Sequence, residues 1–569
     1  MASPDFANHA PKVSSTPLEQ VDVLVEKLAA KKDEWVRTPI ERRRMLLKRC
    51  IESTLGCAEE WVRAACKAKG LDPHEPRGGE EWLGGPMTTV RNLRMLEEAL
   101  EAGGQPAPKR VYRRPDGQWV AEVFPANGWD SLMFGGFTAE VWMEPGKEPT
   151  QGRIYRDKTR GELPPGKVAL VLGAGNVASI GPMDALYKLF VEDEVVLVKT
   201  NPVNAYLQPY WEESFRPLIE EGVFYVVRGG AEVGRHLVHH PKVDTIHMTG
   251  SDRTHDAIVW GADPAEQARR KRSGEKVVDK PMTSELGAVT PVFVVPGPWS
   301  DADLRYQARQ IAGMVTNNAS FNCNAAKVLV TADGWPQRAL LLEHLERVLE
   351  ATPPRMAYYP GAQARYDGFL SCYPEAKPLG PRSGSVVPWT IIPEVPAEKG
   401  EHALTSEAFC GVLAQVGLPA ADPRAFLEAM VEFGNETCWG TLSCVILIHP
   451  ETQKAYAKEL DSAIARLRYG GIAINAFAGV LYALVSPSWG AFPGHPDEDI
   501  RSGRGVVHNA FLFDHPERTV LKAPFRIRPT PAWFPDHKTL HQLGPALTRF
   551  EAKPKLLTLA PVLAAALRG

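Results

Sequence analysis

Residues 167–199 hold three segments in close succession: KVALVLG (167–173), PMDALYKLFVED (182–193) and EVVLVK (194–199). The first and third segments are short runs of aliphatic residues, which are typical of buried strands. The middle segment has apolar residues at helical spacing. A strand, a helix and a second strand in this order predict a βαβ unit with parallel strands and a right-handed crossover.

The same alternation continues along the chain. A helix is expected at 210–222 and strands at 224–229 and 243–250, and a second series of strands follows. The second series comprises AVTPVFVVPG (288–297), KVLVTA (327–332), TLSCVILIH (441–449) and GGIAINAF (470–477). The sequence therefore predicts an α/β fold with two consecutive parallel-sheet domains, whose ligands bind at the carboxyl ends of the strands.

The regions outside these strands differ in composition. A pair of N-terminal helices is expected after a flexible tail at residues 1–17. Residues 111–166 are rich in Pro, Gly and aromatic residues, which predicts hairpins or a long crossing ribbon. The polar segment 262–280, which includes the run Arg269–Arg272, predicts a solvated loop rather than a phosphate site. Residues 553–569 predict a short apolar helix that docks on the body or on another subunit.

The composition excludes several classes of protein. The 569 residues are 44% hydrophobic and 23% charged with a net charge of −3, which excludes disorder, fibres and a charge-driven nucleic-acid or membrane partner. A small-molecule partner is expected instead. The eight cysteines form no CxxC pair, no signal peptide is recognisable, and no uncharged apolar run is long enough to span a membrane. These features predict reduced thiols and a cytoplasmic protein.

A glycine-rich loop follows the first quoted strand. Gly173 to Ala178 read GxGxxA, and such a loop before a helix can hold a pyrophosphate on free amide groups. Taken alone this signal is weak. The usual dinucleotide fold places an acidic residue at the end of the next strand, where this chain has Lys199. A lysine there is compatible with a 2′-phosphate.

A second interpretation accounts for more of the chain. Seven segments resemble, in order, those of the aldehyde dehydrogenase superfamily, and the resemblance covers roughly residues 18–528: AGN (174–176), VVLVKTNP (195–202), HPKVDTIHMTGS (240–251), SELGAVTPVFV (284–294), NNASFNCNAAK (317–327), SEAFCGV (406–412) and AINAF (473–477). Any one segment alone would be unspecific. The chain is identified by this order as a divergent member.

The resemblance implies an atypical Rossmann cofactor domain, a catalytic domain and a β-ribbon oligomerisation element. A homodimer or homotetramer would follow from the ribbon. The implied bounds are 18–117 and 165–283 for the dinucleotide-binding domain, 284–510 for the catalytic domain, 118–164 and 511–530 for the ribbon, and 531–569 for a C-terminal extension.

Three catalytic residues follow from the resemblance. Cys323 matches the nucleophile, and a cysteine thiolate can add to an aldehyde carbonyl. Glu285 matches the general base that activates water. Asn176 matches the side chain that helps to bind the oxyanion. Without the resemblance, these residues would be interpreted as a buried small hydrophobe, a salt-bridged surface residue and a turn residue.

The resemblance also implies an NAD or NADP cofactor and no metal. Lys199 would hold the adenosine ribose, Gly250 and Ser251 the pyrophosphate, and Glu407 and Phe409 the nicotinamide end. Pro202 replaces the acidic residue that often selects NAD in the family, so both cofactors stay possible. The substrate is a small aldehyde, and its pocket is expected to include Phe321, Phe477 and Trp489, although aromatic residues in loops are equally often plain packing.

Two departures from the family pattern leave other functions open. The Gly and Gln that usually precede the nucleophile are absent, and Phe321 and Asn322 directly precede Cys323. His255 stands where the family has a glycine near the cofactor. The leading hypothesis is NAD(P)-dependent oxidation of an aldehyde to a carboxylic acid through a thioester. The alternatives are a CoA-acylating aldehyde dehydrogenase and a non-catalytic scaffold or binding protein on the same fold.

Overall fold

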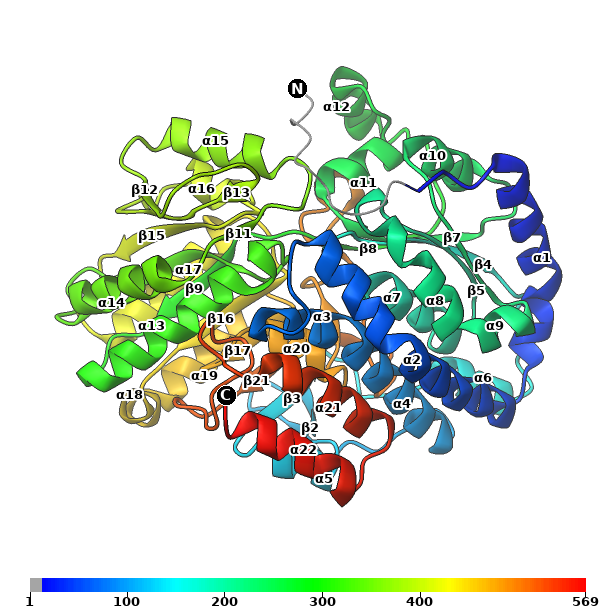
Figure 1. The fold of residues 1–569 in the computed structure, drawn as a ribbon, viewed down its shortest axis with the longest axis horizontal. Coiled ribbons are helices and arrows are strands. Elements are labelled where there is room, and N and C mark those ends of the chain that lie inside the picture. Colours follow the sequence, from blue (N-terminus) through cyan, green and yellow to red (C-terminus); the bar gives the residue numbers. More distant parts are fainter. Residues whose placement is uncertain (1–12) are drawn as a thin grey trace.

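The computed structural model describes residues 13–569. Residues 1–12 of the predicted flexible tail lie outside the described residues, and 13–17 form neither helix nor strand. Two large sheets organise the rest of the chain, and Figure 1 shows them in separate halves of the molecule. The prediction of two α/β units is confirmed.

The first sheet contains the strands quoted at the start. Its five central strands are parallel, and β19 joins the edge in antiparallel direction. In spatial order the strands are β19 (Gly503–Arg504), β8 (Met282–Leu286), β7 (Thr245–Gly250), β4 (Val168–Leu172), β5 (Val195–Lys199) and β6 (Phe224–Val227). The helices around it are α1 (Leu18–Arg37), α2 (Ile40–Ala68), α7 (Ile180–Phe190), α8 (Gln208–Ser214), α9 (Arg216–Glu221), α10 (Ala231–His239) and α11 (Asp252–Val259).

The second sheet has eleven strands, and its centre is parallel. In spatial order they are β1 (Arg110–Arg113), β2 (Trp119–Phe124), β3 (Thr138–Met143), β21 (Pro516–Lys522), β17 (Gly471–Ile474), β16 (Ser443–Leu447), β9 (Thr290–Val294), β10 (Ala326–Ala332), β15 (Val412–Leu418), β14 (Trp389–Ile392) and β12 (Lys377–Leu379). Its main helices are α13 (Asp301–Thr316), α14 (Arg338–Ala351), α15 (Ala362–Cys372), α17 (Pro423–Glu436), α18 (Pro450–Ala455) and α19 (Ala457–Arg466). The antiparallel strands β1 to β3 continue this sheet through β21, and β2, β3 and β21 lie within the segments 118–164 and 511–530 where the ribbon is expected.

One local prediction was wrong. Residues 264–273 form a helix, α12 (Pro264–Ser273), where a loop was expected. Asp263 caps this helix by accepting a hydrogen bond from the Glu266 amide, and Pro264 suits the first helical position. None of its residues is buried, so the run of basic residues stays solvated.

The C-terminal residues form a helical pair on the body of the protein. The helices α21 (Leu540–Ala552) and α22 (Leu556–Ala566) pack on each other, and α21 also contacts α3 (Gly79–Trp82) and α4 (Thr88–Glu101) (Figure 1). None of the described helices is long and apolar enough to cross a membrane. Within residues 13–569 no group of three or more metal-ligating side chains is arranged to hold an ion.

Buried charges fix α21 to α4. The Glu551 carboxylate accepts a hydrogen bond of 2.8 Å from Arg91 Nη1 and pairs with Arg94, and Arg91 also pairs with Asp130 at 3.1 Å. All four side chains are buried. Because a buried charge without its partner is costly, each member depends strongly on the others.

We expect Glu551→Ala to lower the free energy of unfolding by about 3–5 kcal/mol, since it leaves two buried guanidinium groups without their shared carboxylate. The midpoint of urea unfolding measures this loss. Glu398→Ala, at an exposed position without an ion pair among the described residues, serves as the control and is expected to have little effect. Equal midpoints for the two variants would contradict the prediction.

Candidate active site

The thiol loop joins α13 to β10 and has an unusual backbone. Asn318, Ala319 and Ser320 have φ angles of 50°, 54° and 67°, so three consecutive residues lie in the left-handed region. Each such non-glycine residue costs about 1–2 kcal/mol. Backbone strain of this kind persists only where the surrounding structure holds it, and it is common at functional sites.

A buried lysine supports this loop. Lys69 Nζ donates hydrogen bonds to Glu81 Oε1 (2.8 Å), Asn318 Oδ1 (3.0 Å) and the Asn176 carbonyl (3.2 Å). The Tyr358 hydroxyl lies within hydrogen-bond distance of the same Asn176 carbonyl (2.9 Å) and of Asn318 Oδ1 (3.0 Å). Side chains far apart in the sequence thus hold the loop against the end of β4.

Asn176 lies directly beside the thiol loop. Its side-chain Nδ2 donates to the Phe321 carbonyl at 2.8 Å, two residues before Cys323. A Cβ atom on the neighbouring Gly175 would lie 2.8 Å from Asn201 Oδ1 and from Val203, so only glycine fits this close approach. The 173–178 loop therefore brings Asn176 to the thiol loop.

Cys323, in the loop before β10 of the second sheet, lies close to Glu285, on β8 of the first sheet. Glu285 lies on β8, opposite Thr249 of β7. Burial raises the pKa of the Glu285 carboxyl to about 8, partly offset by the Cys323 thiol. Burial and then Glu285 raise the pKa of the Cys323 thiol well above its usual value. Cys323 keeps some solvent exposure, whereas its neighbours Asn322 and Asn324 are buried.

Glu407 and Phe409 lie next to this pair. A Cβ atom on Gly287, two residues after Glu285, would lie 2.0 Å from Glu407 Oε2, so the carboxyl rests directly on the backbone there. Burial raises the pKa of Glu407 to about 7, and its Oε1 has no hydrogen-bond partner within residues 13–569. The ring of Phe409 lies 5.6 Å from that of Phe321. Lys327 Nζ lies 5.8 Å from the centre of the Phe409 ring.

The remaining predicted cofactor residues lie at strand ends of the first sheet. Lys199 ends β5, and its Nζ donates only to the Thr200 carbonyl, at 3.2 Å, among the described groups. Burial lowers the pKa of Lys199 to about 8. Gly250 is exposed at the end of β7, and Ser251 Oγ caps α11 by accepting from the Thr254 amide at 3.2 Å. The His255 side chain is buried within α11.

These residues fit a dinucleotide in their chemistry. An ammonium group without a carboxylate partner suits a ribose or phosphate, an exposed helix N-terminus suits a pyrophosphate, and the unpartnered carboxyl oxygen of Glu407 can accept from a ribose hydroxyl.

The three expected pocket aromatics are all buried. Phe321 packs against Tyr358 and Tyr359, with ring centres 4.9 and 5.8 Å away. Phe477 lies 6.5 Å from the ring of Trp533 in the C-terminal segment. Trp489 is fully buried near Glu285.

Sequence reasoning missed a buried polar cluster that lies near Glu285. Thr249 Oγ1 donates to Asp184 Oδ2 at 2.9 Å, and His247 Nε2 lies 3.4 Å from the same oxygen. The ring of His508 lies 4.3 Å from that of Tyr482. Asp184 is the single carboxylate among the apolar residues of α7, and this was a signal that could have identified it.

Comparisons with known proteins found similarity to one family. The model of the aldehyde dehydrogenase family matches residues 198–352. The chain is 24% identical over 294 residues to a Staphylococcus haemolyticus protein whose assigned name is that of the same family, and the match covers 48% of this chain and 57% of the relative. It is 31% identical over 136 residues to 4-trimethylaminobutyraldehyde dehydrogenase of Oryzias latipes, covering 24% of this chain and 22% of that enzyme.

Solved structures share the fold over nearly the whole chain. Glyceraldehyde-3-phosphate dehydrogenase of Methanocaldococcus jannaschii, complexed with NADP, is 13% identical with a TM-score of 0.58 and covers 90% of this chain and 96% of its own. Indole-3-acetaldehyde dehydrogenase, complexed with NAD+, is 17% identical with a TM-score of 0.59 and covers 91% of each chain. The expected aldehyde dehydrogenase fold is confirmed.

Proposed function

We propose that this chain, a distant member of the aldehyde dehydrogenase superfamily, oxidises an aldehyde to a carboxylic acid with NAD or NADP. One observation carries the proposal. The side chains of Cys323 and Glu285 lie close together, and Asn176 donates a hydrogen bond to the loop that holds Cys323, although the three residues come from different elements. A nucleophile, a base and an amide donor are the groups that acyl chemistry on a thiol needs.

The Cys323 thiol would add to the aldehyde carbonyl carbon. The Glu285 carboxylate can accept the thiol proton, because the two side chains lie within hydrogen-bonding reach of each other. The carbonyl oxygen then becomes an oxyanion. The Asn176 amide and the Cys323 backbone N–H would stabilise that charge, a contribution typically of about 3–4 kcal/mol.

Lys199, the Gly250–Ser251 turn, Glu407 and Phe409 would hold the cofactor. When bound, the nicotinamide supplies the acceptor for the hydride that leaves the former carbonyl carbon, so that an acyl thioester remains on Cys323. Pro202 provides no carboxylate against a 2′-phosphate, so the proposal includes both NAD and NADP.

Water would then release the acid. Glu285 first releases the thiol proton to solvent and then takes a proton from water, the water oxygen attacks the thioester carbon, and the Cys323 sulfur leaves as a thiolate. A carboxyl at Glu285 favours hydrolysis over transfer to CoA. Strict dependence of turnover on CoA would instead support the CoA-acylating alternative.

The substrate is inferred to carry hydroxyl or amino groups. His508 Nδ1 lies 3.3 Å from the Tyr482 carbonyl and therefore donates to it, so Nε2 is an acceptor without a donor among the described residues. Burial lowers the pKa of His508 to about 4, so the ring is neutral at pH 7. The Asp184 carboxyl also lies near Glu285. His508 Nε2 and this carboxyl would therefore be the hydrogen-bond acceptors for a polar aldehyde.

The test is NAD(P)H formation at 340 nm with both cofactors and a panel of short apolar, aromatic and hydroxylated aldehydes. The proposal expects turnover, fastest with hydroxylated members. Absence of any aldehyde-dependent signal would contradict it. If the melting temperature also stays unchanged with NAD and NADP, the non-catalytic scaffold becomes the better explanation.

We expect the steady-state rate to rise with pH around a midpoint near 8. Glu285 acts as a base only when ionised, and a pKa of about 8 leaves about one tenth of it ionised at pH 7. The pH profile of kcat between 6 and 10 measures this effect. A rate that is flat or falls across this range would contradict the assignment of Glu285 as the base.

We also infer a cytoplasmic homo-oligomer. All eight cysteines are free thiols, which suits a reducing compartment, and the antiparallel strands β1 to β3 offer the ribbon by which subunits would assemble. Light scattering of the purified protein measures the subunit number, and a monomer would contradict this inference.

A further inference from the structure

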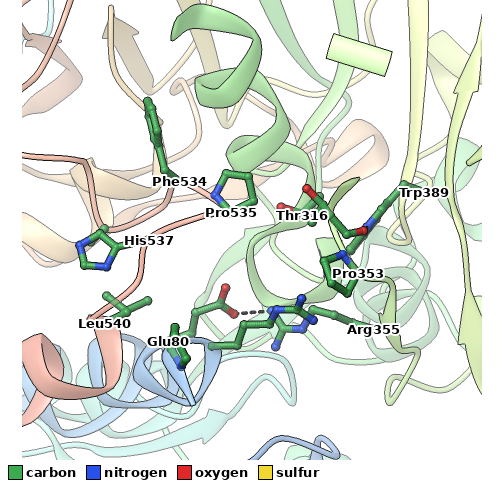
Figure 2. A pocket seen from close by; sticks show the side chains of 13 residues that line it. Glu80, Thr316, Pro353, Arg355, Trp389, Phe534, Pro535, His537 and Leu540 are labelled. Carbon is green, nitrogen blue, oxygen red and sulfur yellow. Dashed lines mark hydrogen bonds and ion pairs between the residues drawn. The ribbon is translucent and has the colours of Figure 1, made fainter. Parts of the chain in front are cut away.

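A small pocket, partly open to solvent, lies behind the thiol loop, away from the reacting groups. Figure 2 shows it where α3, the end of α13, the segment before β14 and the C-terminal segment meet. Its polar lining includes Arg77, Glu80, Arg355 and His537. No step of the proposed reaction uses this pocket.

The pocket has more hydrogen-bond donors than acceptors. Arg355 Nη1 pairs with Glu80 Oε2, as the dashed line in Figure 2 marks. Arg77 forms no ion pair and no side-chain hydrogen bond with any other residue of 13–569, and burial and then Arg355 lower its pKa. The Thr539 amide donates to His537 Nδ1 at 3.3 Å, so His537 Nε2 carries the hydrogen and has no acceptor in the described chain.

This arrangement favours an anion. Two guanidinium groups, those of Arg77 and Arg355, line the pocket together with one carboxylate, that of Glu80, which pairs with Arg355. A buried or half-buried positive charge is stabilised by an oxyanion, and guanidinium groups recognise carboxylate and phosphate oxygens in a bidentate manner.

The same carboxylate connects the pocket to the thiol loop. Glu80 Oε2 accepts a hydrogen bond from the Asn318 backbone amide at 3.1 Å as well as from Arg355. Asn318 is the first of the three left-handed residues that lead to Cys323. Any group that competes with Glu80 for Arg355 therefore affects the residue whose carboxylate holds the strained turn at Asn318.

We propose that a small oxyanion, either a carboxylate or a phosphate, binds to Arg77 and Arg355 in this pocket and regulates the thiol loop. The anion draws Arg355 away from Glu80, Glu80 gains freedom to move, and the turn before Cys323 loosens. The thiol then becomes more accessible. This inference does not depend on the reaction proposed for Cys323, because both the binding and the loosening are measured without turnover.

Calorimetric titration of the purified full chain with inorganic phosphate, and separately with acetate, tests the binding. We expect a dissociation constant in the millimolar range or below for at least one anion, and about tenfold weaker binding in Arg77→Gln. Arg77 has no partner to lose, so this variant is expected to fold. Arg160→Gln, an exposed arginine without an ion pair in the described residues, is the matched control and should bind as the wild type does.

The rate of Cys323 alkylation by iodoacetamide tests the regulation. Cys323→Ala provides the background from the other thiols. We expect the saturating anion to accelerate alkylation at least about twofold in the wild type and in Arg160→Gln, but not in Arg77→Gln. Sodium chloride at equal ionic strength controls for screening.

Three results would overturn the proposal. If neither anion gives a heat of binding, or if the wild type and Arg77→Gln bind with equal affinity, the proposed binding site is wrong. If the alkylation rate of Cys323 does not change at a saturating anion concentration, the proposed regulation of the thiol loop is wrong.

Discussion

Replacing Cys323 with alanine is expected to abolish aldehyde-dependent NAD(P)H formation, with a loss of kcat/KM of at least about 10⁴-fold. The reason is chemical: the thiol forms the bond to the carbonyl carbon, and no other thiol can take its place. Among the other seven cysteines, all except Cys372 are buried. The 340 nm assay with the best aldehyde of the panel measures the loss.

Cys372→Ala provides the matched control. It removes the one other accessible thiol within residues 13–569, on α15, and is expected to keep wild-type activity. Cys323→Ala should also keep the melting temperature close to that of the wild type, since a partly exposed thiol contributes little packing. If Cys323→Ala retains a tenth of the wild-type kcat/KM, a covalent mechanism on this residue is wrong.

Replacing Glu285 with glutamine is expected to separate the two halves of the reaction. Glutamine has nearly the same shape but cannot take a proton from water, so hydrolysis should slow by about 10²–10⁴-fold. The oxidation half needs the base less strongly, because replacing Glu285 also removes the main cause, after burial, that raises the pKa of the Cys323 thiol. Rapid mixing at pH 9 should therefore show a burst close to one NAD(P)H per subunit, followed by slow turnover.

Hydroxylamine provides the control for this variant. As a strong nucleophile it should cleave the accumulated thioester without a general base and restore part of the steady-state rate. Mass spectrometry should show the acyl group on Cys323. A Glu285→Gln variant that turns over like the wild type would show that Glu285 is not the base, and full activity only with CoA would favour acyl transfer to a thiol.

The fold was predictable from local patterns because each strand and helix carries its own periodicity. The segments at 167–199 form β4, α7 and β5 in the positions expected from their apolar spacing. The segment 262–280 was misjudged because its high charge masked the signal of Asp263 and Pro264, a cap and a first-turn proline. In a solvated helix, local capping decides the structure without any apolar face.

The site was less predictable. The residues Cys323, Glu285 and Asn176 followed from a resemblance and not from any local pattern. The groups that hold them, such as Lys69 and Tyr358, act across large sequence separations and carry no motif. The polar cluster of Asp184 and His508 was missed for the same reason, since only the packed structure brings α7 near residue 508.

The pairing of β3 with β21 has a consequence for how the protein is made. β3 is complete at residue 143, but its partner begins at residue 516, so about 370 residues must be synthesised before the edge of β3 is covered. At a translation rate of about 5–20 residues per second, the ribosome needs roughly 20–75 seconds for this stretch. Throughout that interval the nascent chain carries an open strand edge, a target for chaperones and for aggregation with neighbouring chains. Expression at lower temperature or with more chaperone should raise the yield of folded protein.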